Sequence, residues 1–285
     1  MKDLGIPVVV EPGSQPADED GVVIDYMKMP QSVWTYDVPV VPEPEDVVGL
    51  DEGLKALTLI RDSLSRYEPG TSAVSIPLDH LDPKNRTLID QVLGNGEVSI
   101  VFDGPVSARI QESVLTGVWR VQYVDDDDQI IEDVVEVASV PKLIERAVFT
   151  NAAENISFEV DGIPAEVGNA PAIMTEIQDK LAEYAKSGAV HVVNLTLLPC
   201  SDADLDFMAT MLGSGPAVIL SRGYGNCRIT STGTRNLWWV QFFNSQDTLI
   251  LNSLEVSAVP EVACAAPEDL ADSAERLDDI LELYQ

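Results

Sequence analysis

The stretch that decides the fold is LGNGEVSIVFDGPVSARIQESVLTGVWRVQYVDDDDQIIEDVVEVASVP, residues 93–141, because the chain carries it twice. Shifted by 119 positions without a gap, it aligns with residues 212–260, LGSGPAVILSRGYGNCRITSTGTRNLWWVQFFNSQDTLILNSLEVSAVP. Sixteen of the 49 aligned positions are identical. A gapless match of this length predicts an internal duplication.

The predicted helices and strands occur in the same order in both copies. In the first copy, an apolar stripe from Leu50 to Tyr67 predicts a helix, and Asp82 caps a second helix that ends at Leu93. Alternating runs then predict four strands, over 97–102, 108–113, 118–124 and 130–137. The second copy repeats this order, with helices over 171–185 and 201–212 and a strand over 191–197 between them.

This order of elements predicts an α+β fold, built as a tandem duplication of a unit of roughly 100 residues. Each unit is a helix-strand-helix followed by a mostly antiparallel four-strand meander, and we expect the two units to be pseudo-twofold related. The patterns leave open whether the units share one continuous sheet or sit as separate lobes.

Composition divides the chain into five predicted segments. The first is rich in proline and acidic residues, and the last has apolar residues spaced for one face of a helix that we expect to pack on the second unit. The segments are an extended acidic, proline-bearing arm (1–48), a first α+β repeat (49–142), a connector (143–168), a second α+β repeat (169–262) and a C-terminal helix (263–285).

The charge of the chain restricts its partners. Asp and Glu number 48 against 17 Lys and Arg, which gives a formal net charge of -31. Such a field repels nucleic acid and anionic membranes and attracts basic partners. The start of the chain lacks the pattern of a signal peptide, and no stretch approaches the roughly 20 apolar residues of a membrane helix. We therefore predict a cytoplasmic protein without stable membrane insertion.

The third strand of the meander differs between the copies on one face. Trp119 and Val121 in copy one match Trp238 and Val240 in copy two, and alternation places all four in the core. The opposite face has Arg120 and Gln122 in copy one. In copy two it has Trp239, Gln241 and Phe243. These aromatic residues either pack against the other copy or the closing helix, or form an exposed anchor for a partner.

The turn between the first and second strands of the meander differs as well. The segment Asp103–Arg109 corresponds to Arg222–Arg228, SRGYGNCR being the sequence of residues 221–228. Two arginines beside Cys227 could lower the pKa of its thiol and make it reactive or metal-binding. Alternatively, the arginines pair with carboxylates and only shape the hairpin.

Motifs for catalysis are missing from the sequence. There is no nucleophile–histidine–acid set, phosphate loop or dinucleotide fingerprint. Three cysteines, Cys200, Cys227 and Cys264, share no CxxC spacing and are weak metal candidates, so we predict reduced thiols. We expect a binding protein, not an enzyme, with no catalytic residues and no cofactor.

Several stretches together resemble the HupH/HyaF/HoxQ family of hydrogenase expression and maturation proteins. The likeness covers most of the chain from about residue 50. The stretches that carry it are Gly94–Val98, Ile110–Val114, Gly117–Val121, Ser221–Ile229, Leu237–Ser245 and Asp247–Asn252.

This resemblance implies a cytosolic accessory factor for [NiFe] hydrogenases. We expect a scaffold or chaperone for the immature hydrogenase small subunit before export, with that precursor and other hydrogenase maturation proteins as partners. The alternative is a metal- or iron–sulfur-handling maturation factor, for nickel incorporation or cluster protection. The candidate partner-binding residues are Arg222, Tyr224, Asn226, Arg228, Trp239, Gln241, Phe243 and Asn244.

Overall fold

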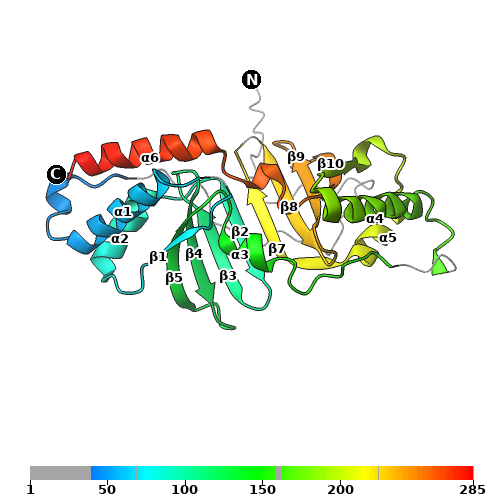
Figure 1. Cartoon of the computed structure of the whole chain (residues 1–285), viewed down its shortest axis with the longest axis horizontal. Helices are drawn as coiled ribbons and strands as arrows, with labels where there is room; N and C mark the ends of the chain where they lie inside the picture. The colour runs from blue at the N-terminus through cyan, green and yellow to red at the C-terminus, as the bar shows by residue number, and fades with distance from the viewer. Residues whose placement is uncertain (1–39, 69, 158–161, 224, 285) are drawn as a thin grey trace, which may run out of the picture.

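A single sheet runs through both halves of the protein (Figure 1). The structure is a computed structural model that describes residues 40–68, 70–157, 162–223 and 225–284. Its ten strands have the order β1-β5-β4-β3-β2-β7-β8-β9-β10-β6, and neighbouring strands pair antiparallel. The two predicted units therefore share one continuous sheet and do not form separate lobes.

The predicted helices and strands are confirmed, with ends that move by a few residues. The first half contains α1 (Asp51–Leu64), β1 (Val74–Pro77), α2 (Pro83–Leu93), β2 (Val98–Asp103), β3 (Ser107–Glu112), β4 (Val118–Val124) and β5 (Ile130–Val137). The second half contains α4 (Ala170–Ser187), β6 (His191–Asn194), η3 (Leu195–Leu197), α5 (Asp202–Leu212), β7 (Ser214–Ser221), β8 (Asn226–Thr232), β9 (Leu237–Phe243) and β10 (Leu249–Val256).

Among the residues that the structure describes, four more elements lie outside these two series. They are η1 (Pro44–Asp46), α3 (Lys142–Ala147), η4 (Glu261–Ala263) and α6 (Pro267–Glu282). Most of the predicted arm, residues 1–39, lies outside the described residues, but Val47 at its end is buried in the core beside α1.

Strands β2 and β7 join the two halves at the centre of the sheet. Ile100 pairs with Ile219, its own equivalent 119 positions later, and Val98 and Phe102 pair with Ser221 and Ala217. The strand order is consequently the same when counted outward from this pair in either direction.

Alternating side chains give the sheet two different faces. On one face, Trp119, Val121, Trp238 and Val240 form a central core that is covered by α3 and the residues after it. The opposite face, which we call the helical face, carries α1 and α2 over the first half and α4 and α5 over the second. The centre of the helical face, over β2, β3, β7 and β8, lies between the two helix pairs.

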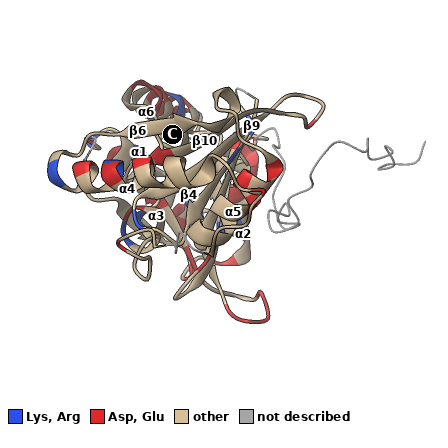
Figure 2. Ribbon diagram, turned by 90° about the vertical axis from the view of Figure 1, so that its right-hand side faces the viewer, with Lys and Arg blue, Asp and Glu red and all other residues tan. Residues whose placement is uncertain are grey.

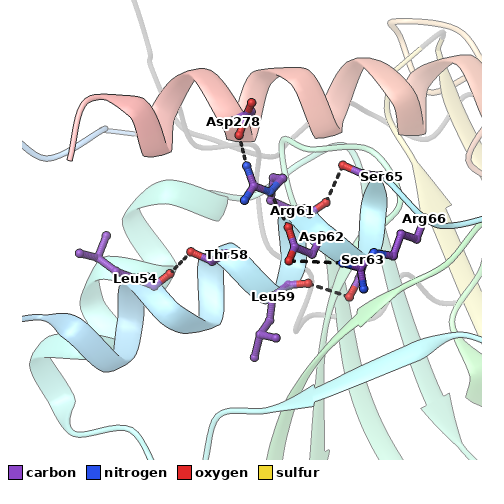
Figure 3. A network of polar contacts seen from close by, with 9 residues as sticks. All are labelled: Leu54, Thr58, Leu59, Arg61, Asp62, Ser63, Ser65, Arg66 and Asp278. Atoms are coloured by element: carbon purple, nitrogen blue, oxygen red, sulfur yellow. Dashed lines mark hydrogen bonds and ion pairs between the residues drawn. The ribbon is translucent and has the colours of Figure 1, made fainter. Parts of the chain in front are cut away.

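Helix α6 packs on the first half, so the prediction that it packs on the second unit is wrong. Leu277 of α6 is fully buried in the same core as Leu57 and Ile60 of α1. Figure 3 shows Arg61 of α1 directed at Asp278 of α6, with which it forms an ion pair. The last segment of the chain therefore closes the core formed by the first helix.

The chain segment that leads into α6 explains why α6 packs on the first half. Ala265 donates its backbone N–H to the carbonyl of Ser139 at 2.8 Å, and the Ser139 hydroxyl donates back at 2.9 Å. These bonds fasten the chain after β10 to the end of β5, in the first half. Gly117 then leaves space for Leu270, because a Cβ at this glycine would lie 2.1 Å from Leu270 Cδ2.

Candidate functional site

A hollow of about 440 Å³ lies on the helical face at the end of the β7–β8 hairpin. Four of the predicted site residues lie together here, because Asn226, Arg228 and Phe243 point to one face by strand alternation and Arg222 follows β7. The lining residues are Leu220, Ser221, Arg222, Asn226, Cys227, Arg228, Phe243 and Asp247.

Arg228 is the half-buried cation of the hollow. Its guanidinium carbon lies 5.6 Å from the centroid of the Phe243 ring, which is cation–π geometry. Burial lowers the pKa of Arg228 from its ordinary value, although a guanidinium remains charged at any physiological pH. Beside it, the Asn226 amide donates to the carboxylate of Asp247 at 3.2 Å.

Exposed aliphatic side chains that the residue pattern did not indicate lie on β10, next to Phe243 of the hollow. Leu249 lies directly opposite Phe243 in the β9–β10 pairing and is 41% exposed, and Ile250 is 56% exposed. The pairing register shifts between Leu249 and Leu251. This irregularity breaks the simple alternation from which a solvent-facing position is inferred.

The equivalent hairpin of the first half has different charged residues around its arginine. Arg109, the equivalent of Arg228, donates to Asp103 at 2.8 Å and to Asp128 at 3.0 Å. In the second half the position of Asp128 is still an aspartate, but the position of Asp103 is Arg222. The hollow has therefore exchanged a carboxylate for a second arginine. Elsewhere on the ribbon, acidic residues outnumber basic ones, as Figure 2 shows.

Three of the predicted site residues, Trp239, Gln241 and Asn244, do not line the hollow. Trp239 is only 4% exposed and Gln241 only 5%, so the Trp239 ring is buried and is not a surface anchor. It packs in the core of its own half, with Met208 and Ala209 of α5, and not against the other copy or the closing helix as expected. The Asn244 side chain accepts the backbone N–H groups of Gln246 and Thr248, both at 2.9 Å, and so holds the β9–β10 turn. Tyr224 lies outside the described residues.

Burial of Trp239 replaces an ion network of the first half. There, Arg120 forms a bidentate ion pair with Asp133 and reaches Asp90 of α2 at 2.8 Å. The equivalents of these three residues are Trp239, Asn252 and Ala209, and the Trp239 indole N–H donates to the Asn252 side chain. An aromatic ring, an amide and a small residue thus occupy the place of three charged groups.

Comparison with known proteins identifies the family. A family model described as "HupH hydrogenase expression protein, C-terminal conserved region" matches residues 52–156 and 167–284. The chain belongs to the HupH hydrogenase expression protein family. Hydrogenase expression/formation protein HoxQ of Cupriavidus necator is 46% identical over 283 residues, which cover 99% of this chain and 98% of the relative.

Another HupH-family protein matches over almost the whole chain, and a solved structure matches over part of it. Hydrogenase expression/formation protein HupH of Rhodobacter capsulatus is 42% identical over 279 residues, 97% of this chain and 96% of the relative. A solved structure of hydrogenase expression protein HupH from Thiobacillus denitrificans covers 39% of this chain and 92% of its own, with 26% identity and a TM-score of 0.38.

The pKa values of all three cysteines of this HupH-family chain are raised, so the alternative in which two arginines lower the pKa of Cys227 is wrong. The Cys227 side chain lies in the core with Ile229 and Trp238, on the face opposite Arg228. Burial raises the pKa of Cys227 to about 12 and that of Cys264 to about 11, and it also raises the pKa of Cys200.

Metal-binding clusters are likewise not supported by the geometry. Within the described residues, no group of three or more His, Cys, Asp or Glu side chains could hold a metal ion. Cys200 packs with the helices of the second half, whereas Cys227 belongs to the central core. The weak metal candidates therefore do not converge.

Glu112 is a buried carboxyl group outside the hollow. Burial raises its pKa to about 7, and its carboxylate accepts the backbone N–H of Gly117 at 3.1 Å. It lies at the β3–β4 turn under α6, away from Arg228, and holds that turn.

In the described parts of the chain, none of the helices is long and apolar enough to span a bilayer.

Proposed function

We propose that this protein is a hydrogenase maturation accessory protein that holds the immature small subunit of a [NiFe] hydrogenase before export. The observation that carries the proposal is the family match over both halves of the chain, together with relatives named hydrogenase expression/formation proteins. Such names describe a helper in the formation of an enzyme, and we infer a role in binding and not in catalysis.

The choice of the small subunit rests on charge. A precursor exported by the twin-arginine route begins with a basic region followed by an apolar stretch. A chain with a net charge of -31 attracts that region over long distances and steers it to the surface. The precursor exists only before export, so we place this encounter in the cytoplasm.

The hollow has a separate part in the proposed contact. Arg222 and Arg228 repel a basic segment, and they suit a carboxylate from the folded body of the partner. The Phe243 ring and the exposed Leu249 side chain offer an apolar platform beside the two cations. We infer that the hollow binds an acidic or aromatic side chain of the partner, while the acidic surface attracts its basic leader.

The architecture supports the proposal that the two halves have different roles. One family model matches two separate segments, and Ile100 pairs with its own equivalent Ile219 at the centre of the sheet. We infer that the chain arose by duplication of one unit and that the two units are pseudo-twofold related. In this account α6 belongs structurally to the first unit, and the second unit carries the partner site.

We expect the double variant Arg222→Asp with Phe243→Ala to bind the small-subunit precursor at least about tenfold more weakly than the wild type. The aspartate restores the first-half charge pattern, and the alanine removes the aromatic platform. The measurement is a titration of purified precursor by biolayer interferometry. Asp103→Ala, at the equivalent position of the first half, is the matched control and should bind like the wild type. Unchanged affinity in a folded double variant would contradict the proposed site.

A further inference from the structure

The two edges of the sheet differ in how far they are protected from pairing. In the described part of the chain, β1 pairs with β5 and β6 pairs with β10, so each has one side without a strand neighbour. Val74 pairs with Val137 and His191 with Val256, and these partners are equivalents, so β1 and β6 correspond residue by residue. The first half is therefore an internal reference for the edge of the second.

Strand β1 carries features that discourage addition of another strand. It ends in Pro77, which has no N–H to donate to a neighbouring strand. Ser75 is polar, and its hydroxyl donates to Glu136 at 3.2 Å. Proline and polar residues of this kind are common means of blocking edge-to-edge association.

Strand β6 has lost both features. Asn194 replaces Pro77, so the strand keeps its backbone donor at this position, and Val192 replaces Ser75 with 51% of its surface exposed. Val190, Leu197 and Leu198 around the strand are 60%, 80% and 38% exposed. An edge with β-branched residues, intact donors and a surrounding aliphatic surface is suited to pairing with an extended segment.

The charges near β6 indicate what kind of segment it fits. Glu176 of α4 lies 2.9 Å from the His191 ring at the start of the strand, and Glu183 of the same helix forms an ion pair with Lys180 at 2.8 Å. A second copy of this chain brings its own charge of -31 to the edge and is repelled. A segment with basic residues next to its apolar part is attracted.

We propose that the free edge of β6 is a strand-addition site for an extended, aliphatic segment of a partner protein with basic residues at one flank. Backbone hydrogen bonds to β6 give the affinity, the exposed Val192 contacts an aliphatic side chain of the segment, and Glu176 and Glu183 meet the basic flank. The inference rests on the edge strand alone and does not depend on the hollow or on the hydrogenase role.

The test uses a fluorescein-labelled peptide of about ten residues, two arginines followed by alternating valine and threonine. We expect saturable binding to the full-length protein by fluorescence anisotropy, with slower hydrogen exchange at residues 190–194. Val192→Lys, which places a charge on the edge, should weaken binding at least about tenfold. Ser75→Lys, at the equivalent position of β1, is the matched control and should bind the peptide like the wild type. A peptide with glutamates in place of the arginines should also bind at least about tenfold more weakly.

Four results would overturn the proposal. They are equal affinity for the wild type and Val192→Lys, exchange protection that maps away from β6, absence of peptide binding, and a protein dimer that dissociates on Val192→Lys substitution. The last result would assign the edge to a second copy of the chain. If Val192→Lys does not fold, hydrogen exchange of the wild-type complex decides the question by itself.

Discussion

Asp133→Ala should lower the free energy of unfolding by about 3–5 kcal/mol, one of the two largest effects that we expect. The Asp133 side chain is 3% exposed, and the Arg120 side chain that it binds is 16% exposed. Removal of Asp133 leaves the guanidinium under α2 with Asp90 alone, whose side chain is 60% exposed. A buried charge that loses its main partner retains its full cost of desolvation.

The second half indicates how this loss can be compensated. We expect the triple variant Arg120→Trp, Asp133→Asn and Asp90→Ala to be more stable than Asp133→Ala, because it reproduces the arrangement of Trp239, Asn252 and Ala209. Urea unfolding followed by circular dichroism measures both. Glu132→Ala, at an exposed position of the same strand, is the control. A loss for Asp133→Ala no greater than that of the control would show that the ion network does not stabilise the fold.

Asp204→Ala should cost at least about 3 kcal/mol. One carboxylate oxygen accepts the backbone N–H groups of Gly168, Asn169 and Ala170 at 2.8–2.9 Å, which fixes the start of α4. The other oxygen accepts the backbone N–H and the hydroxyl of Ser201, which caps α5. Loss of this carboxylate leaves five donors without an acceptor at the point where two helices meet.

The same carboxylate predicts a pH dependence. Burial alone raises the pKa of Asp204, but its hydrogen bonds outweigh that effect and lower the pKa to about 2, below the ordinary 3.8. A lowered folded-state pKa gives a stabilisation that is complete above about pH 4 and is lost as the pH falls towards 2, worth about 2 kcal/mol.

Unfolding measured between pH 2 and pH 6 should show this acid-induced loss in the wild type and in Asp206→Ala, an exposed acid on the same helix. The loss should be smaller in Asp204→Ala. Identical pH profiles for Asp204→Ala and Asp206→Ala would contradict this role of Asp204.

The duplication made most of the fold predictable. Helix caps, strand alternation and the 119-residue offset were sufficient for the elements and for the core face of Trp119 and Trp238. The partner of α6 was not predictable, because an apolar stripe on a helix does not specify which of two similar cores it covers. Pairing of Ala265 with Ser139, a contact between residues far apart in sequence, decides it.

The candidate site was predictable in part, and Trp239 shows why. Alternation places Arg228 and Phe243 on one face, but the same rule cannot tell whether Trp239 on that face is covered by a helix. A signal was available in the sequence: the replacement of Arg120, Asp133 and Asp90 by Trp239, Asn252 and Ala209 removes three charges together, as expected of a buried contact. Leu249 was missed because the register shift of β10 does not show in the residue pattern.

A photo-crosslinking pair tests most directly whether the second half holds the small-subunit precursor. A photoreactive amino acid replaces Leu249, next to Phe243 of the hollow, in one protein and its equivalent Ile130, which is 52% exposed, in the other. Both proteins are irradiated with the purified small-subunit precursor, and the adducts are identified by mass spectrometry. Our account predicts an adduct with the precursor from position 249 and little or none from position 130. Equal adducts from both positions, or no adduct from position 249, would contradict it.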